Sequence, residues 1–132
     1  MNRVSVSITN FGIEWDKDFV ASSIPKYLQE QIEEAEVVLA ASAPGDYPEL
    51  EALVPAVLIA TQAELDFKRL TELVNEPSDK PVLVVELPRR GWTWPGGQQH
   101  ACFILDGHHR VASANIRGVK VQAVVVRKAG GA

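Results

Sequence analysis

Five consecutive residues near the carboxyl end of the chain carry the side chains best suited to chemistry, Asp106-Gly107-His108-His109-Arg110. They bring a carboxylate, a glycine, two imidazoles and a guanidinium into one short segment. An apolar run precedes the segment and a helical pattern follows it, so we expect a turn that leads from a strand into a helix. The N-terminus of a helix offers unpaired N–H groups and a partial positive charge. The segment therefore predicts an anion site, most suited to a phosphate group.

Each residue of this turn has a role that its type suggests. Gly107 permits a tight turn and a close approach of a ligand to the backbone. Arg110, His109 and the N–H groups after Gly107 would hold a phosphate, with His108 as a further binding residue. Asp106 would cap the helix, act as a base or hold a metal ion. Because a cation in the first helical turn opposes the helix dipole, a bound anion explains Arg110 better than an exposed charge does.

The helical spacing turns His108 toward the apolar Val111 and Ala112, whereas the next two residues point elsewhere. A hydrogen-bonded structural histidine is therefore the simpler interpretation of His108. Zinc needs three or four ligands, adjacent histidines on a helix diverge by about 100°, and the single cysteine, Cys102, lies upstream on a strand. We therefore predict no structural zinc site.

The elements that must position this turn follow from periodicity and from turn signals. Ser23 and Pro25 predict the start of an amphipathic helix that ends before Pro44, with Glu side chains on its outer face. Alternating or apolar runs predict strands, and segments with helical spacing predict helices. Strands are expected at 4–9, 56–60, 81–87, 101–105 and 119–126, helices at 62–76 and 108–117, a helical turn within 48–54, and loops at 11–20 and 88–99.

Length and composition predict one α/β (α+β) domain, a mixed sheet flanked by helices. The chain has 132 residues, of which 46% are hydrophobic and 23% charged, as in ordinary globular proteins. A net charge of −4 disfavours nonspecific attraction to nucleic acid, although a local basic patch stays open. With one cysteine and no visible signal peptide or membrane-spanning run, we expect a cytoplasmic protein without membrane contact.

The segment from Ile104 to Ala114, followed by Gly118 and the strand from Gln122 to Val126, resembles the signature of the ParB/sulfiredoxin superfamily. The resemblance covers roughly residues 56–126. It implies a compact domain at 51–127 whose signature turn holds the phosphates of a nucleotide, ATP, ADP or CTP, with or without Mg²⁺. Residues 1–50 would add a strand and an amphipathic helix that packs on the sheet or forms a dimer contact, and 128–132 a flexible tail.

Members of this superfamily differ in activity, so the departures matter. Sulfiredoxins carry a catalytic cysteine where this chain has His108, which argues against that activity. Partition proteins carry a Gly-Glu-Arg-Arg signature and a further helix-turn-helix domain. Free serine kinases have the Asp-Gly-His-His-Arg form seen here. They also carry a glutamate just before the helix that precedes the central strand. Glu64 stands near that place, or Asp66 if the alignment shifts by two.

The leading hypothesis is hydrolysis of a nucleoside triphosphate or transfer of its phosphate to a small hydroxyl substrate. Glu64 would then be the general base, assisted by Asp106 and His109. Glu64 is equally consistent with an ordinary exposed glutamate. The sequence contains no Walker phosphate loop, dinucleotide fingerprint or serine elbow.

A loop with Arg89, Arg90, Trp92 and Trp94 raises a second hypothesis, a DNA-binding or nuclease module. Aromatic and basic side chains on one loop suit stacking on bases and contact with phosphates. They suit a partner contact or a hydrophobic lid equally well. A third hypothesis is a partner-binding protein without catalysis.

Overall fold

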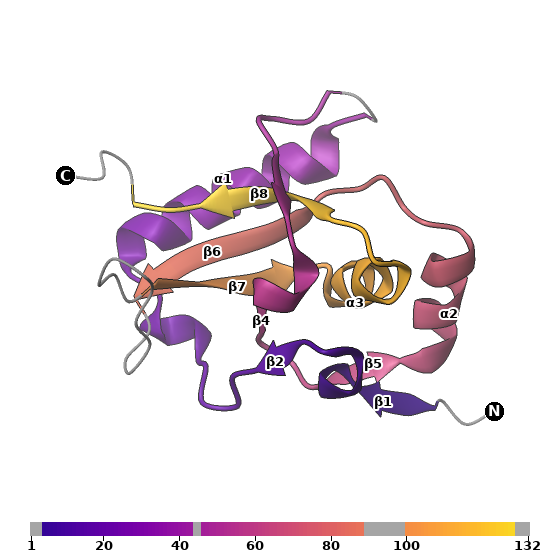
Figure 1. Ribbon diagram of the computed structural model, residues 1–132. Helices are drawn as coiled ribbons and strands as arrows, with labels where there is room; N and C mark the ends of the chain where they lie inside the picture. Colours follow the sequence, from indigo (N-terminus) through magenta and orange to yellow (C-terminus); the bar gives the residue numbers. More distant parts are fainter. Residues whose placement is uncertain (1–3, 44–45, 89–99, 129–132) are drawn as a thin grey trace.

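The main sheet is mixed and has six strands in the order β2-β4-β7-β6-β8-β3. A separate two-stranded sheet, β1-β5, lies beside it (Figure 1). The computed structural model describes residues 4–43, 46–88 and 100–128. The strands are β1 (Ser5–Ser7), β2 (Glu14–Trp15), β3 (Glu51–Leu53), β4 (Ile59–Ala60), β5 (Glu64–Asp66), β6 (Val82–Pro88), β7 (His100–Asp106) and β8 (Val121–Val126). The helices are α1 (Lys26–Ala41), α2 (Phe67–Asn75) and α3 (His108–Arg117), with short 3-10 turns η1 (Ile8–Phe11), η2 (Ala21–Ser23) and η3 (Pro55–Val57).

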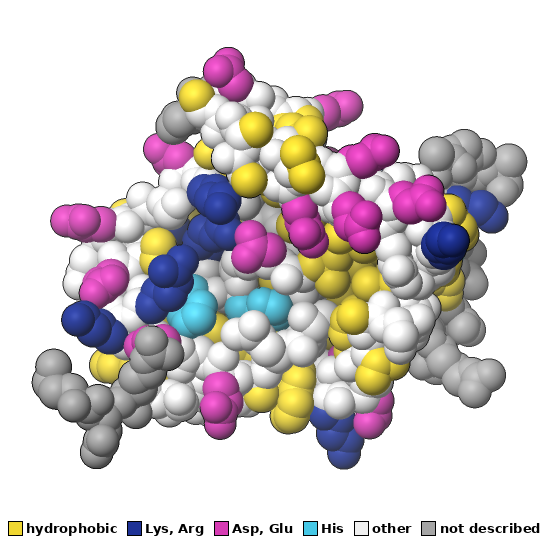
Figure 2. Space-filling model, turned by 180° about the vertical axis from the view of Figure 1, so that it is seen from behind, with side chains coloured by type: hydrophobic (Ala, Val, Ile, Leu, Met, Phe, Trp, Pro, Cys, Tyr) yellow, Lys and Arg dark blue, Asp and Glu magenta, His cyan; other side chains and the backbone are white. Residues whose placement is uncertain are grey.

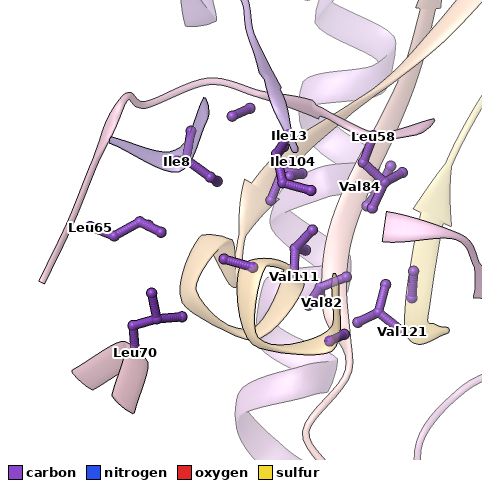
Figure 3. Packing of buried hydrophobic residues seen from close by; sticks show 14 residues of the cluster. Ile8, Ile13, Leu58, Leu65, Leu70, Val82, Val84, Ile104, Val111 and Val121 are labelled. Carbon is purple, nitrogen blue, oxygen red and sulfur yellow. The ribbon is translucent and has the colours of Figure 1, made fainter. Parts of the chain in front are cut away.

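The central strand β6 separates two hydrophobic layers. It pairs antiparallel with β7 and parallel with β8, and its side chains alternate between the faces of the sheet. On one face, Val82 and Val84 pack with Val111 of α3 (Figure 3). On the other face, Leu83 and Val85 belong to the cluster that includes Leu28, Ile32 and Leu39 of α1. Helices on both faces of one sheet make this a single α/β domain.

Helix α1 runs behind the sheet in Figure 1. Its glutamates 30, 33, 34 and 36 are exposed, and the three apolar residues that face the sheet are buried. The amphipathic helix is thus confirmed, although it begins at Lys26 with Pro25 rather than Ser23 at the N-cap. None of the helices in the described part of the chain is both long and apolar enough to cross a membrane.

The expected elements around the turn are confirmed. Strands occur at 82–88, 100–106 and 121–126, and a helix spans 108–117. Gly118 ends this helix in the left-handed conformation, with φ of 69°, and its N–H bonds back to the carbonyls of Ala114 and Asn115.

Several predictions for the first half of the chain are wrong. The segment 48–54 contains strand β3, which pairs antiparallel with β8, instead of a helical turn. The expected strand at 4–9 stops at Ser7, and the expected loop at 11–20 includes β2. The strand at 56–60 shortens to Ile59–Ala60. Each of these segments is short and pairs with a strand far away in sequence, so local periodicity did not decide its conformation.

Candidate functional site

The turn between β7 and α3 lies at the end of the sheet near α2. Strand β7 ends at Asp106, Gly107 occupies the N-cap with φ of 100°, and α3 begins at His108. A Cβ at position 107 would lie 2.6 Å from Val82 Cγ1, so both the conformation and the space require glycine. No side chain caps the helix, and the expected capping role of Asp106 is wrong.

A small polar pocket of about 200 Å³ opens at this turn. It is lined by the five residues from Asp106 to Arg110, together with Leu105, Gln62 and Arg69. Figure 2 shows histidine side chains on this face of the molecule, with an arc of Lys and Arg side chains on one side and Asp and Glu side chains above. The first N–H groups of α3, which have no partner within the helix, belong to this same turn.

His108 is a buried structural residue, only 5% exposed. Its Nε2 accepts a hydrogen bond of 3.1 Å from the backbone N–H of Thr61. An amide N–H can only donate, so Nε2 carries no proton and the neutral ring carries it on Nδ1. Burial lowers the pKa of His108 to about 4, assisted by His109 and opposed by Asp106. The ring is therefore neutral at pH 7 and joins the turn to the end of β4.

His109 is held in the same manner by a different element. Its Nε2 accepts a hydrogen bond of 2.9 Å from the backbone N–H of Asp66. Burial lowers the pKa of His109, the nearby Arg69 lowers it further, and Asp66 acts in the opposite direction. With Nε2 engaged, this neutral ring offers the pocket a donor on Nδ1 and has no open nitrogen to act as a base.

Arg110 anchors the start of β6 as well as lining the pocket. One terminal nitrogen, Nη1, donates to the carbonyls of Lys80 at 2.9 Å and Pro81 at 2.6 Å. The other, Nη2, donates to Asp106 Oδ2 at 3.2 Å. Its side chain is 10% exposed, and burial lowers its pKa while Asp106 raises it. The guanidinium is thus fixed in place beside the turn, with part of its donor capacity already used.

Asp106 is the accessible carboxylate of the pocket. Its side chain is 60% exposed, and Oδ2 is the atom that Arg110 contacts. Asp106 can accept a proton or bind a cation on the solvent side. No group of three or more His, Cys, Asp or Glu side chains within residues 4–43, 46–88 and 100–128 is arranged to hold a metal ion.

Arg69 is a residue of the candidate site that the sequence pattern missed. It lies in the first turn of α2, is exposed and lines the pocket. It lowers the pKa of both His109 and Arg110, as expected for a positive charge close to each of them. Its guanidinium makes no hydrogen bond or ion pair with another described residue. The sequence around Arg69 gives no sign that this residue belongs to the site, because α2 meets the turn only in the folded chain.

Glu64 lies apart from the pocket that the turn forms. The helix expected from residue 62 begins only at Phe67, and Glu64 is an exposed residue of β5 opposite Ser7 of β1. It is absent from the residues that line the pocket. Asp66, the alternative position, caps α2 by accepting from the N–H groups of Lys68 and Arg69. The hydrogen bond from the Asp66 N–H to His109 places Asp66 next to the turn.

The remaining site predictions concern the loop after β6. Arg89, Arg90, Trp92 and Trp94 lie outside the described residues. Cys102, in β7, is partly buried, and burial raises its pKa to about 11, with Glu86 adding to the effect. A thiol with that pKa is not a nucleophile at neutral pH.

Comparison with known proteins does not identify a family for this chain. No protein-family model matches the chain, and no curated protein matches it in sequence.

Proposed function

We propose that this protein binds a nucleotide through its phosphates at the N-terminus of α3. There it would hydrolyse a nucleoside triphosphate or transfer a phosphate to a small hydroxyl substrate. The observation that carries the proposal is the convergence of Arg69, Arg110 and an uncapped helix N-terminus on one polar pocket. Backbone N–H groups and guanidinium groups are the donors that phosphates prefer. The resemblance of the turn to ParB/sulfiredoxin signatures supports the same ligand class.

The two arginines would divide the work. Arg110 is held by two carbonyls and a carboxylate, so it presents a fixed charge that needs no rearrangement on binding. Arg69 is exposed and unpaired among the described residues, so it is able to close on a phosphate. The neutral His109 would donate a hydrogen bond from Nδ1 to a phosphate oxygen.

Asp106 is the group best placed to assist the reaction. Mg²⁺ in nucleotide sites is usually bound by one or two carboxylates and by the phosphates themselves, which suits a single exposed aspartate. Bound there, the ion would neutralise charge that develops on the transferred phosphate. Without it, Asp106 would serve as the base for the attacking hydroxyl or water. Glu64 keeps a role in this proposal only through an acceptor that extends beyond the pocket.

Calorimetry with ATP, ADP and CTP, with and without Mg²⁺, tests binding. Arg69→Gln should weaken binding by at least about tenfold, since a hydrogen bond to a charged group contributes about 1.5–3 kcal/mol. Lys68→Gln, which removes an exposed charge next to Arg69 in sequence but outside the pocket, is the matched control. Binding by none of the three nucleotides would exclude the proposal.

Phosphate release separates catalysis from binding. Asp106→Asn should lower the rate of release by a factor of roughly 10²–10⁴ if the carboxylate is the base, while nucleotide affinity changes little. A protein that binds nucleotides but shows no turnover, with or without this substitution, would instead be a binding module.

A second candidate is binding of single-stranded nucleic acid, favoured by the arc of Lys and Arg side chains beside the histidines (Figure 2). Neutralised phosphates release counterions, so such binding should weaken steeply with salt. Retardation of a single-stranded oligonucleotide at low salt, lost as salt is raised, would support it. No retardation at low salt would eliminate it.

A further inference from the structure

A second pocket lies along α3, next to the candidate site. It measures about 220 Å³ and is bounded by the segment 77–80, by α3 and by the start of β8. Helix α3 contributes Arg110, Ser113, Ala114 and Arg117, which share one helix face through their spacing of three and four. Arg110 lines both pockets and stands between them.

Positive charge dominates this second pocket. Lys80, Arg117 and Lys120 line it and are exposed, whereas Asp79 is the one acidic residue in its lining. None of these three cations forms an ion pair with a described residue. In a chain whose net charge is −4, these cations without carboxylate partners make the potential in this pocket positive, which favours an anionic ligand.

The two pockets have the separation that one ligand would need. The α3 residues of the first pocket centre on His109, and those of the second on Ser113 and Ala114. At 1.5 Å of rise per residue, the centres lie about 7 Å apart along the helix. Two phosphate groups carried by one ribose have a comparable separation.

We propose that the second pocket binds another phosphate group of the same ligand, so that the ligand is a nucleotide phosphorylated at two positions of its ribose. The inference rests on the proposed function, because the first phosphate occupies the turn. Arg110, fixed by its contacts with Lys80 and Pro81, lies between the two phosphates. Arg117 and Lys120 contact only the second phosphate.

Two sources share this chemistry, a free 3′,5′-bisphosphate and the 5′-phosphorylated end of a longer strand. Calorimetry with adenosine 5′-monophosphate, adenosine 3′,5′-bisphosphate and 5′-phosphorylated oligonucleotides distinguishes them. The bisphosphate should bind at least about tenfold more tightly than the monophosphate, the gain expected from one set of charged hydrogen bonds. If a longer strand binds far more tightly than the bisphosphate, the free bisphosphate is overturned as the ligand and the 5′ end of a strand takes its place.

The double variant Arg117→Gln/Lys120→Gln should abolish that gain and leave the affinity for the monophosphate unchanged. The matched control is Lys17→Gln/Lys26→Gln, which removes two charges away from both pockets and should keep the gain. Equal affinities for the mono- and bisphosphate, or a gain that survives in the double variant, would overturn the second phosphate site alone. Absence of binding by the monophosphate and by ATP, ADP and CTP would refute the proposed function itself.

Discussion

The backbone N–H of Asp66 donates a 2.9 Å hydrogen bond to Nε2 of His109, and this bond joins the start of α2 to the first turn of α3. Asp66 also caps α2, so the same residue ends β5, begins α2 and orients a histidine of the candidate site. Arg69, one turn further along α2, lines the same pocket as His109.

Replacing His109 should loosen the junction between α2 and α3. His109→Ala removes the acceptor of the Asp66 N–H, and we expect a loss of about 1 kcal/mol in the free energy of unfolding. Hydrogen exchange at the Asp66 amide should become faster. His109→Gln, which keeps an acceptor of similar reach, should retain most of the protection. Unchanged exchange in the alanine variant would show that the bond does not hold the junction.

His108 should make stability depend on pH. Its pKa falls from 6.5 in the unfolded chain to about 4 in the folded protein, so the unfolded chain binds more protons between these values. Stability is therefore complete above pH 6.5 and is lost as the pH falls toward 4, by an amount on the order of 3 kcal/mol.

Denaturant unfolding between pH 4 and 8 measures this dependence. In His108→Gln, which cannot titrate and still offers an acceptor to the Thr61 N–H, the slope assigned to this residue should disappear. An identical pH profile in both proteins would assign the dependence to other groups.

Gly107 and Gly118 allow the effect of space to be separated from that of backbone conformation. Both have positive φ, but a Cβ at Gly107 meets Val82 at 2.6 Å, whereas a Cβ at Gly118 meets no atom within 4 Å. Gly118→Ala should cost about 1–2 kcal/mol from the left-handed conformation alone. Gly107→Ala should cost about 1–3 kcal/mol more because the turn is overpacked. Thermal unfolding measures both, and equal losses would contradict the predicted clash.

Cys102 should be nearly inert. Since burial raises its pKa to about 11, iodoacetamide should alkylate it about a hundredfold more slowly at pH 8 than it does free cysteine. Mass spectrometry of intact protein follows the reaction. If native Cys102 is alkylated less than tenfold more slowly than Cys102 in denaturant, the thiol is accessible and the prediction is wrong.

Local sequence was sufficient for the part of the fold nearest the turn. The apolar strand β7, the obligatory glycine, the helix spacing of α3 and the closing Gly118 all lie within one short segment. Each could be inferred from residue types within the segment, although the space that excludes a side chain at Gly107 is limited by Val82 of β6. The inward position of His108 followed from the same spacing.

The strand pairings between distant segments could not be predicted from local sequence. The pairing of β5 with β1 turned the expected start of a helix into a strand, and so moved Glu64 away from the turn and placed Asp66 beside it. The pairing of β3 with β8 converted an expected helical turn into an edge strand. Both pairings join segments far apart in sequence and depend on the whole sheet.

The sequence by itself determined that this protein has a glycine-initiated helix after a buried strand, with histidines and an arginine in the first turn. Only the tertiary structure decided which charges surround that turn. Arg69 arrives from α2, and Lys80, Arg117 and Lys120 gather around a second pocket that shares Arg110. Long-range packing brings Arg69 and Lys80 to α3, whereas the spacing of α3 already places Arg117 on the same face as Arg110.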